Sequence, residues 1–389
     1  MVKSFNYYQP TRIIFGVGRR KELGIWVKRF GEKVLVVVDP NVEKFLSQQY
    51  QEILDSLHSE GIETIVFDHV IPNPTLDSIQ EGAEVAKKEK VDFVIGIGGG
   101  SAIDTAKAIA VAATHEGTAW DYLYFKKEPT EKTLPIIGVP TTAGTGTQTS
   151  RVSVLTNTEE KCKSAIASDN IICKVAIVDP ELTLTVPPAV TASTGFDVFT
   201  HCFESYINVN NQPYVDMLAL EAIEIVIKYL KKAYDNPGDL EARTKMAWAD
   251  TLAGCCLANV GTTIPHALGQ AIGGHFPHVS HGQSLAVVYP AFLDYTVDWA
   301  VERFAKVARM FNPELEKVSD KEAAYALKQE IVSFLKSINL YYRMEDFGIK
   351  KEDVKDLVKH AIEFPDNRVN PRVPDEKDLE ELYLKSFRD

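Results

Sequence analysis

The sequence predicts an α/β domain built on a parallel sheet, followed by an all-helical domain. Short β-branched runs alternate with helical patterns up to about residue 185, which is typical of βαβ units. Helical periodicity dominates the rest of the chain, where few strand signals occur. A length of 389 residues exceeds what one ordinary core supports. We therefore expect two domains, 1–186 and 187–389, with a boundary near Val186.

The predicted strands are short and rich in Val and Ile. They cover 33–39, 63–68, the run VDFVI from residue 91, 136–140 and 175–180. The clearest helical patterns cover 43–61, 76–90, 213–235 and 320–339. GVGRR at 16–20 lacks the third glycine of a dinucleotide fingerprint, so we interpret it as a strand-to-helix turn. No internal repeat or low-complexity segment is present.

The composition favours small-molecule partners. The 42 basic and 54 acidic residues give a net charge of -12, which would repel nucleic acid and anionic membranes. No run approaches the roughly 18 apolar residues of a membrane span, and the first residues lack a signal-peptide pattern. Five cysteines without a C-x-x-C pair argue against a disulfide framework. We expect a cytoplasmic protein with reduced thiols.

A glycine-rich segment at 96–110, GIGGGSAIDTAKAIA, follows a buried strand and opens a helix. In this context Gly98, Gly99 and Gly100 would let backbone N–H groups approach a pyrophosphate, and Ser101 adds a hydroxyl. A glycine turn with a serine N-cap is the alternative, but it does not readily explain three consecutive glycines. The segment favours dinucleotide binding.

Two further features support a dinucleotide at the same edge of the sheet. PTTAGTGTQTS at 140–150 places small and hydroxyl-bearing residues where a loop leaves a strand's carboxyl end. Asp39 ends the strand KVLVVVD, where a carboxylate can accept a hydrogen bond from a ribose 2′-OH and repel a 2′-phosphate. This position favours NAD over NADP, although a turn-forming Asp before Pro40 is equally consistent with the local sequence.

The stretch GFDVFTHC carries Asp197 and His201 four residues apart, which would place both on one helix face. A local hydrogen bond between them is the alternative. Four of nine histidines fall within sixteen residues: His266, His275, His278 and His281. A Pro- and Gly-containing loop could return His281 towards His266. Together with Asp197 and His201 these two form an Asp/His/His/His set suited to Fe(II), Zn(II) or another first-row divalent ion.

Five motifs together resemble the iron-containing, or group III, alcohol dehydrogenases over nearly the whole chain: GGGSAIDTAKAIA, PTTAGTGTQTS, GFDVFTHCFESY, HALGQAIGGHFPHVSHGQS and NPR. The resemblance implies an N-terminal Rossmann-like domain and an all-helical C-terminal domain, a dehydroquinate synthase-like architecture with the active site between them. The implied metal ligands, for Fe2+ first and Zn2+ second, are Asp197, His201, His266 and His281. The implied nucleotide residues are Asp39, Asn73, Gly98, Gly99, Gly100, Ser101, Asp104, Thr141, Thr142, Thr147 and Lys163.

The chain departs from the family pattern at three places. Thr147 and Gln148 stand where many members have Ser-Glu, and Gln270 stands where many have a further histidine. The loop that leads to His281 is one residue longer than in some relatives. We hypothesise that His275 or His278 supplies the missing imidazole and carries the proton, with the ribose hydroxyls and water as the alternative.

The resemblance implies an alcohol dehydrogenase or aldehyde reductase that depends on a metal and NAD(P). A carbon-oxygen lyase of the dehydroquinate synthase type is the alternative, but it needs basic residues for a phosphate substrate that the helical domain does not evidently offer. A binding protein without chemistry would not need an open metal position, and maleylacetate reductases usually lack the ligand set. Family members are often dimers or larger, so we expect a homo-oligomer that acts on a small alcohol or aldehyde.

Overall fold

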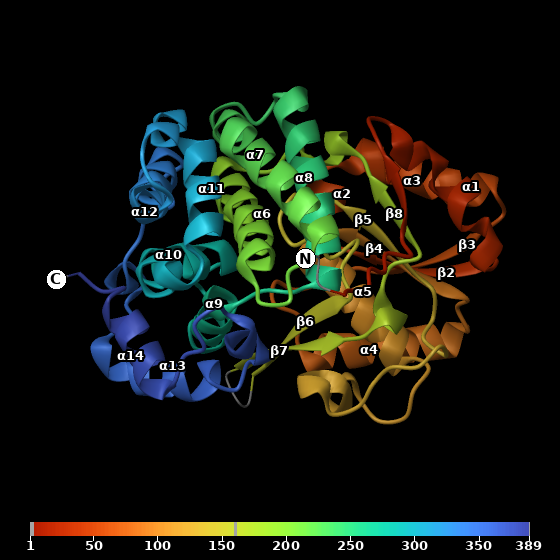
Figure 1. The fold of residues 1–389 in the computed structure, drawn as a ribbon. Helices are drawn as coiled ribbons and strands as arrows, with labels where there is room; N and C mark the ends of the chain where they lie inside the picture. Colours follow the sequence, from red (N-terminus) through yellow and green to blue (C-terminus); the bar gives the residue numbers. More distant parts are fainter. Residues whose placement is uncertain (1–3, 159–161, 389) are drawn as a thin grey trace.

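A computed structural model describes residues 4–158 and 162–388 of the chain (Figure 1). Six strands form one sheet in the order β1-β8-β5-β4-β2-β3, and all neighbouring strands pair in parallel. Their bounds are β1 Arg12–Phe15, β2 Lys33–Val38, β3 Glu63–Phe67, β4 Phe93–Gly98, β5 Ile136–Pro140 and β8 Val175–Val178. The predicted parallel sheet is thus confirmed.

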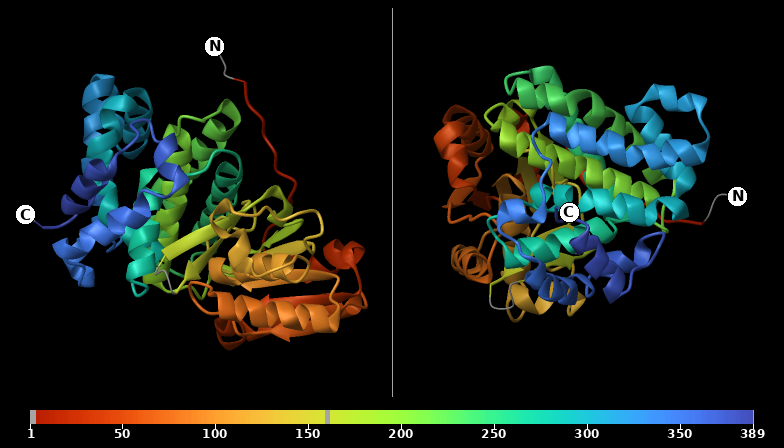
Figure 2. Two further views of the ribbon diagram at one scale, coloured as in Figure 1. Left: turned by 90° about the horizontal axis from the view of Figure 1, so that it is seen from below. Right: turned by 90° about the vertical axis from the view of Figure 1, so that its left-hand side faces the viewer.

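Helices cover both faces of this sheet, as the two further views show (Figure 2). Leu35 and Val37 of β2 pack in a core with residues of α4 (Leu76–Glu89) and α5 (Gly100–Ala112). Val34 and Val36 point to the other face, towards α1 (Leu23–Val27) and α3 (Ser47–Ser59). Burial on both faces explains why this strand is apolar without alternation.

One local prediction needs correction, and three strands were not predicted. The single helix predicted at 43–61 is two helices, α2 (Pro40–Phe45) and α3, separated at Leu46, whose φ of -132° is not helical. β1 was not predicted because RIIF is only four residues long. An antiparallel hairpin of β6 (Val152–Asn157) and β7 (Cys162–Ala167) was also missed. Residues of this hairpin form hydrogen bonds with residues far away in the sequence, and no local sequence pattern indicates such contacts. GVGRR is a turn between β1 and the helix that follows, as predicted.

The second half of the chain is helical. Its α-helices are α6 Pro188–Ile207, α7 Pro213–Asp235, α8 Leu240–Asn259, α9 Ile264–His275, α10 His281–Thr296, α11 Val301–Phe311, α12 Asp320–Ser337, α13 Val354–Ala361 and α14 Glu376–Leu384. Figure 1 shows α6 between neighbouring helices, and its Phe196, Phe199 and Phe203 are fully buried. A helix that is apolar on all sides belongs in the interior, so the polar residues of α6 require a separate explanation.

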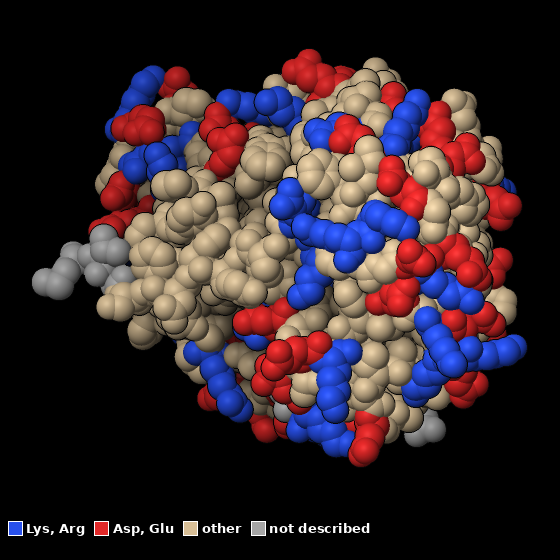
Figure 3. Space-filling view, turned by 90° about the vertical axis from the view of Figure 1, so that its right-hand side faces the viewer, with Lys and Arg blue, Asp and Glu red and all other residues tan. Residues whose placement is uncertain are grey.

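Charged residues are mixed on the face shown in Figure 3, where Lys and Arg side chains are interspersed with Asp and Glu. Such a face lacks the single-sign basic surface that binds nucleic acid. No helix in the described ranges is long and apolar enough to cross a membrane.

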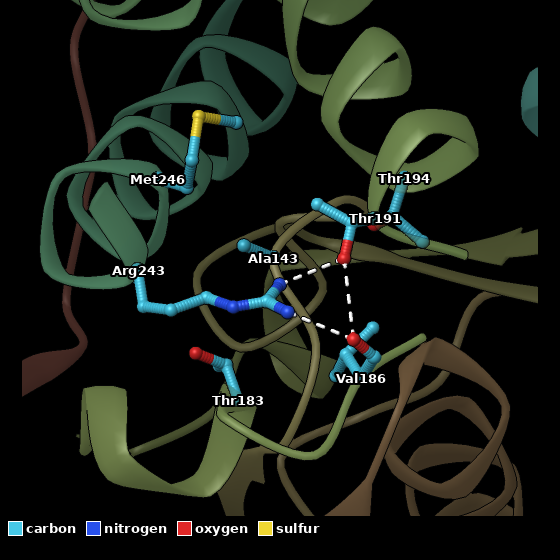
Figure 4. Close-up of a pocket in the computed structure, with 7 residues that line it drawn as sticks. All are labelled: Ala143, Thr183, Val186, Thr191, Thr194, Arg243 and Met246. Carbon is cyan, nitrogen blue, oxygen red and sulfur yellow. Dashed lines mark hydrogen bonds between the residues drawn. The ribbon is translucent and has the colours of Figure 1, made fainter. Parts of the chain in front are cut away.

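Arg243 of α8 fastens the segment that joins the sheet to α6 (Figure 4). Its guanidinium is buried and donates to Thr191 Oγ1 and to the carbonyl of Val186, at 2.8 Å each. A third bond of 3.0 Å reaches the carbonyl of Pro237. The cavity beside it, of about 10 Å³, has room for at most about one water molecule. These contacts fix the connection in place, while the domain boundary at Val186 stays a prediction.

Candidate metal centre and nucleotide pocket

Four potential metal ligands meet at one point. Asp197 and His201 lie one turn apart on α6, His266 lies in the first turn of α9, and His281 is the first residue of α10. One ligand atom from each side chain lies within 4.8 Å of all the others. The Nε2 atoms of His201, His266 and His281 are 3.5, 3.7 and 3.7 Å from Oδ1 of Asp197. The structure therefore brings together the four residues that the sequence singled out.

Helix packing explains how His281 reaches this point. Residues 276–280 turn the chain between α9 and α10, and Ser280 caps α10 through a reciprocal contact with Gln283. Gly282 then allows α10 to approach α6 closely, because a Cβ atom there would lie only 2.1 Å from the carbonyl oxygen of Ser193. The start of α10 therefore rests directly on α6, with His281 facing Asp197.

These residues fit a divalent metal ion. Bonds of about 2.0–2.2 Å in a tetrahedral site put ligand atoms roughly 3.4 Å apart, close to the separations found here. Nε2 of His266 is buried and has no hydrogen-bond partner within the described part of the chain. Burial raises the pKa of Asp197, but the imidazoles of His201, His281 and His266 outweigh it and lower the pKa to about 2. Burial also lowers the pKa of His201 to about 4. The carboxylate of Asp197 and the neutral imidazole of His201 are forms that bind metal. For His266 burial lowers the pKa, but the carboxylates of Glu204 and Asp197 outweigh it and raise the pKa to about 10, so an ion bound there displaces a proton from this ring.

Glu204 supports the cluster and was not among the sequence predictions. It lies on α6 seven residues after Asp197, on the same helix face, and is fully buried. Its Oε1 is 2.9 Å from Nδ1 of His266, and its Oε2 accepts a 2.8 Å hydrogen bond from the backbone N–H of Thr263. An Nδ1–H held in this way leaves Nε2 of His266 for the ion. The spacing Asp-x3-His-x2-Glu was available in the sequence as a signal.

We expect Glu204→Gln to weaken metal binding by about 10- to 100-fold. The neutral amide loses the charge that favours the required orientation and basicity of His266, and it cannot accept from both His266 and the Thr263 N–H without leaving a donor unmatched. Competition between the protein and a chelator for Fe(II) or Co(II) measures the change. Glu224→Gln on the exposed face of α7 is the matched control. Equal affinities in the two variants would contradict this role.

A pocket of about 870 Å³ opens at the metal cluster and extends to the α/β part. Several predicted nucleotide residues line it, namely Asn73, Gly100, Ser101, Asp104, Thr147 and Lys163. The other predicted residues are not among those that line it and lie at the carboxyl ends of β2, β4 and β5, namely Asp39, Gly98, Gly99, Thr141 and Thr142. The chain order reverses between β2 and β4, and open α/β sheets bind ligands at such a switch point.

Backbone contacts join these strand ends. The N–H of Asp39 donates to the carbonyl of Ile97 at 3.0 Å, and that of Thr141 donates to the carbonyl of Gly98 at 2.9 Å. Gly98 has φ +149°, and a Cβ atom there would lie 2.8 Å from Cβ of Asp39. Only glycine suits this backbone conformation and approach. Asp39 also caps α2 through the N–H of Asn41, so the turn-forming role that we considered is present too.

Asp104 and Lys163 have partners within the protein. The carboxylate of Asp104 accepts from Thr147 Oγ1 at 2.5 Å and from the N–H of Val154 at 3.0 Å, which ties the threonine-rich loop and β6 to α5. Lys163 on β7 is buried and donates to Oδ1 of Asn73 at 2.6 Å. Burial lowers the pKa of Lys163 to about 8. Both side chains therefore organise the wall of the pocket.

The threonine-rich loop is anchored on α8. Oδ1 of Asp250 accepts hydrogen bonds of 2.8 Å from the N–H groups of Gly144 and Gly146, and its Oδ2 accepts one of 2.7 Å from Gln148 Nε2. Gly146 also lies against Gly254 without an intervening side chain, because a Cβ atom on Gly254 would be 2.1 Å from the Gly146 carbonyl oxygen. The loop thus joins the nucleotide wall to the helical part.

His275 and His278, which we hypothesised to carry the proton, are not among the residues that line the pocket. His278 is exposed, and its Nε2 lies 3.1 Å from the carbonyl oxygen of Phe347. His275 ends α9 with Nδ1 3.1 Å from the carbonyl of Ala271. His275 is half-buried, and its ring lies 4.7 Å from that of His360. Gln270 and His360 line the pocket instead.

Comparison with known families covers almost the whole chain. Residues 10–180 match the model of the iron-containing alcohol dehydrogenases, and residues 191–387 match the C-terminal model of the same family. A choline dehydrogenase of Bacillus subtilis is 36% identical over 100% of this chain and 96% of its own length. An NAD-dependent methanol dehydrogenase of Bacillus methanolicus is 32% identical over 98% of this chain and 100% of its own length.

Solved structures agree with these matches. The crystal structure of an alcohol dehydrogenase from an archaeal inhabitant of a Red Sea brine pool superposes with a TM-score of 0.94, at 32% identity and over 100% of both chains. The matches support a dehydrogenase over the lyase that we considered, and they make the protein an oxidoreductase acting on CH–OH donors. With two family models covering its two halves, the chain belongs to the iron-containing alcohol dehydrogenase family.

Proposed function

We propose that Asp197, His201, His266 and His281 bind one divalent ion, Fe2+ in preference to Zn2+, and that the adjoining pocket binds NAD in preference to NADP. The main support is the buried Nε2 of His266, which has no hydrogen-bond partner in the described ranges and faces the carboxylate of Asp197. When bound, the metal supplies a Lewis acid for the substrate oxygen, and the nicotinamide supplies the site that exchanges hydride.

In the proposed reaction, a primary alcohol and NAD+ give an aldehyde, NADH and one proton. The carbinol C–H bond breaks and its two electrons leave with the hydrogen as hydride, while the hydroxyl proton passes to solvent. The protein orients the two reactants in one pocket and excludes water from its buried end. Glu204 accepts from Nδ1 of His266, which leaves Nε2 of this imidazole for the ion.

The preference for NAD rests on Asp39. Its carboxylate stands at the end of β2, next to the glycine turn after β4, where it can accept from a ribose 2′-OH and would repel a 2′-phosphate. Gly100 opens α5, whose first N–H groups suit a pyrophosphate. The NAD dependence named for the methanol dehydrogenase relative agrees with this preference.

We further propose a cytoplasmic homo-oligomer that acts on small alcohols or aldehydes. Phe5, Tyr8, Tyr214 and Met217 are each exposed by 46% or more, an amount of bare apolar surface that suits contact between protein chains. The rings of Tyr7 and Tyr214 lie 4.2 Å apart and join the N-terminal segment to α7. The buried cysteines of the described ranges form no disulfide, as suits a reducing compartment.

Removal and return of the metal tests the proposed function. Protein stripped by a chelator should lose its oxidation of a panel of primary alcohols and diols, and Fe(II) added without oxygen, or Zn(II), should restore it. Parallel assays with NAD+ and NADP+ test the role of Asp39. Full activity in protein shown by elemental analysis to be free of metal would refute the metal site, and faster turnover with NADP+ would refute the preference for NAD.

A further inference from the structure

We propose that Gln270 binds the carboxamide of the nicotinamide ring, with its side-chain oxygen as the acceptor for the carboxamide NH2 group. The inference rests on the proposed function, because it takes NAD as the occupant of the pocket. It gives Gln270 the task of orienting the cofactor, at a position where many members of the family have a histidine. No bond forms or breaks at Gln270, so the reaction keeps the balance given above.

An unsatisfied hydrogen-bond acceptor carries the inference. Gln270 lines the pocket, and its Oε1 is buried without a hydrogen-bond partner in the described part of the chain. A buried amide oxygen that has lost water without gaining a donor costs free energy, so such an atom requires an explanation. A ligand that presents an N–H or O–H donor inside the pocket would satisfy this oxygen.

Gln270 lies between the metal cluster and the nucleotide wall. His266, Gln270 and Gly273 occupy one face of α9, because they are four and three residues apart along the helix. His266 belongs to the metal cluster. At Gly273 the helix meets the α/β part, since a Cβ atom there would lie 3.1 Å from Nζ of Lys163. This face of α9 therefore extends about 10 Å from the metal cluster to a predicted nucleotide residue, with Gln270 near its middle.

The nicotinamide ring has to occupy this interval. Its ribose follows the pyrophosphate, for which the first turn of α5 is suited, while C4 of the ring must approach the carbinol carbon of an alcohol at the metal cluster. The carboxamide is the one group on the ring that has N–H donors. A ring turned over about its bond to the ribose would move this group away from Gln270. The hydrogen bond therefore selects the face of the ring that meets the substrate.

A cofactor analogue without the carboxamide NH2 group tests the inference. 3-Acetylpyridine adenine dinucleotide has a methyl ketone in place of the carboxamide, so it keeps the carbonyl oxygen and lacks the donor. Quenching of protein fluorescence gives the dissociation constants of NADH and of the reduced analogue, and steady-state assays give kcat/KM of the oxidised forms. The preference for NADH over the analogue should fall about tenfold in Gln270→Met, which keeps the length of the side chain and removes the amide.

Two controls isolate this hydrogen bond. Nicotinamide hypoxanthine dinucleotide differs from NAD only at the adenine end, so its affinity relative to NADH should be the same in the wild type and in Gln270→Met. Gln329→Met changes an exposed glutamine of α12 outside the pocket and should leave both preferences at the wild-type value. Gln270→Leu repeats the comparison if Gln270→Met does not fold.

The outcomes distinguish this inference from the proposed function. An equal preference for NADH over the acetylpyridine analogue in the wild type and in the Gln270 variant would overturn the inference and leave the dehydrogenase intact. A change confined to the relative kcat/KM of primary alcohols and diols would also overturn it, because Gln270 would then contact the substrate. Absence of NADH binding, or of metal-dependent turnover with every alcohol, would instead refute the proposed function.

Discussion

Asp197→Ala is expected to abolish stoichiometric metal binding and to lower kcat/KM at least about a thousandfold. Asp197 supplies the only carboxylate of the cluster, and its Oδ1 lies within 3.7 Å of all three imidazoles. Without it the ion loses one of four ligands and the one that carries negative charge, so only neutral imidazoles of this cluster face the divalent charge in a buried site. Elemental analysis of the purified variant and steady-state kinetics measure the two effects.

A control separates the loss of metal from a loss of fold. Asp235→Ala removes an exposed carboxylate that pairs with Lys231 at the end of α7, and it should leave metal content and kcat/KM at the wild-type level. Circular dichroism should show native helix content in both variants. A metal content near one ion per chain in Asp197→Ala, with activity reduced less than about tenfold, would rule out Asp197 as a ligand.

Asp250→Ala is expected to destabilise the protein by about 3–5 kcal/mol. The truncation leaves three buried donors without an acceptor, the N–H groups of Gly144 and Gly146 and the amide of Gln148. Because these donors belong to the threonine-rich loop, NAD affinity should fall as well. Urea unfolding gives the free energy, and fluorescence titration with NADH gives the affinity. A loss below about 1 kcal/mol would show that the loop does not depend on this carboxylate.

Asp250→Asn gives the matched comparison, because it keeps the shape and removes the ionisable group. Burial raises the pKa of Asp250 to about 6, against the effect of its hydrogen bonds. The pKa of this group in the unfolded chain is about 4. At a pH between about 4 and about 6, the folded protein therefore holds a proton that the unfolded chain has released. This group therefore makes the folded state less stable as the pH rises from about 4 to about 6. The free energy of unfolding of Asp250→Asn should lack this decrease.

Local geometry explains which parts of the site the sequence could predict. Asp197 and His201 were predictable because a four-residue spacing on one helix places two side chains together wherever the helix lies. Helical spacing along α6 would also have predicted Glu204, which lies three residues after His201. His281 was predictable because only a short loop separates α9 from α10.

Long-range contacts explain what the sequence could not predict. His278 turns towards the carbonyl of Phe347, 69 residues further along the chain, so its direction does not depend on its own motif. Asp104 has the position of a cofactor residue, but its partner Thr147 lies 43 residues away. The hairpin β6–β7 likewise depends on contacts with α5 and was missed. Each of these features depends on a tertiary contact that no local pattern contains.

The contact between Gly146 and Gly254 restricts how the pocket can open. Two backbones in direct contact can turn against each other, but they cannot separate without breaking the hydrogen bonds of Asp250 to the same loop. The threonine-rich loop therefore keeps its position on α8 as long as these hydrogen bonds hold. Any side chain at position 254 would displace the backbone of Gly146 and with it Thr147, which lines the pocket, so a substitution inside α8 would reshape the nucleotide wall.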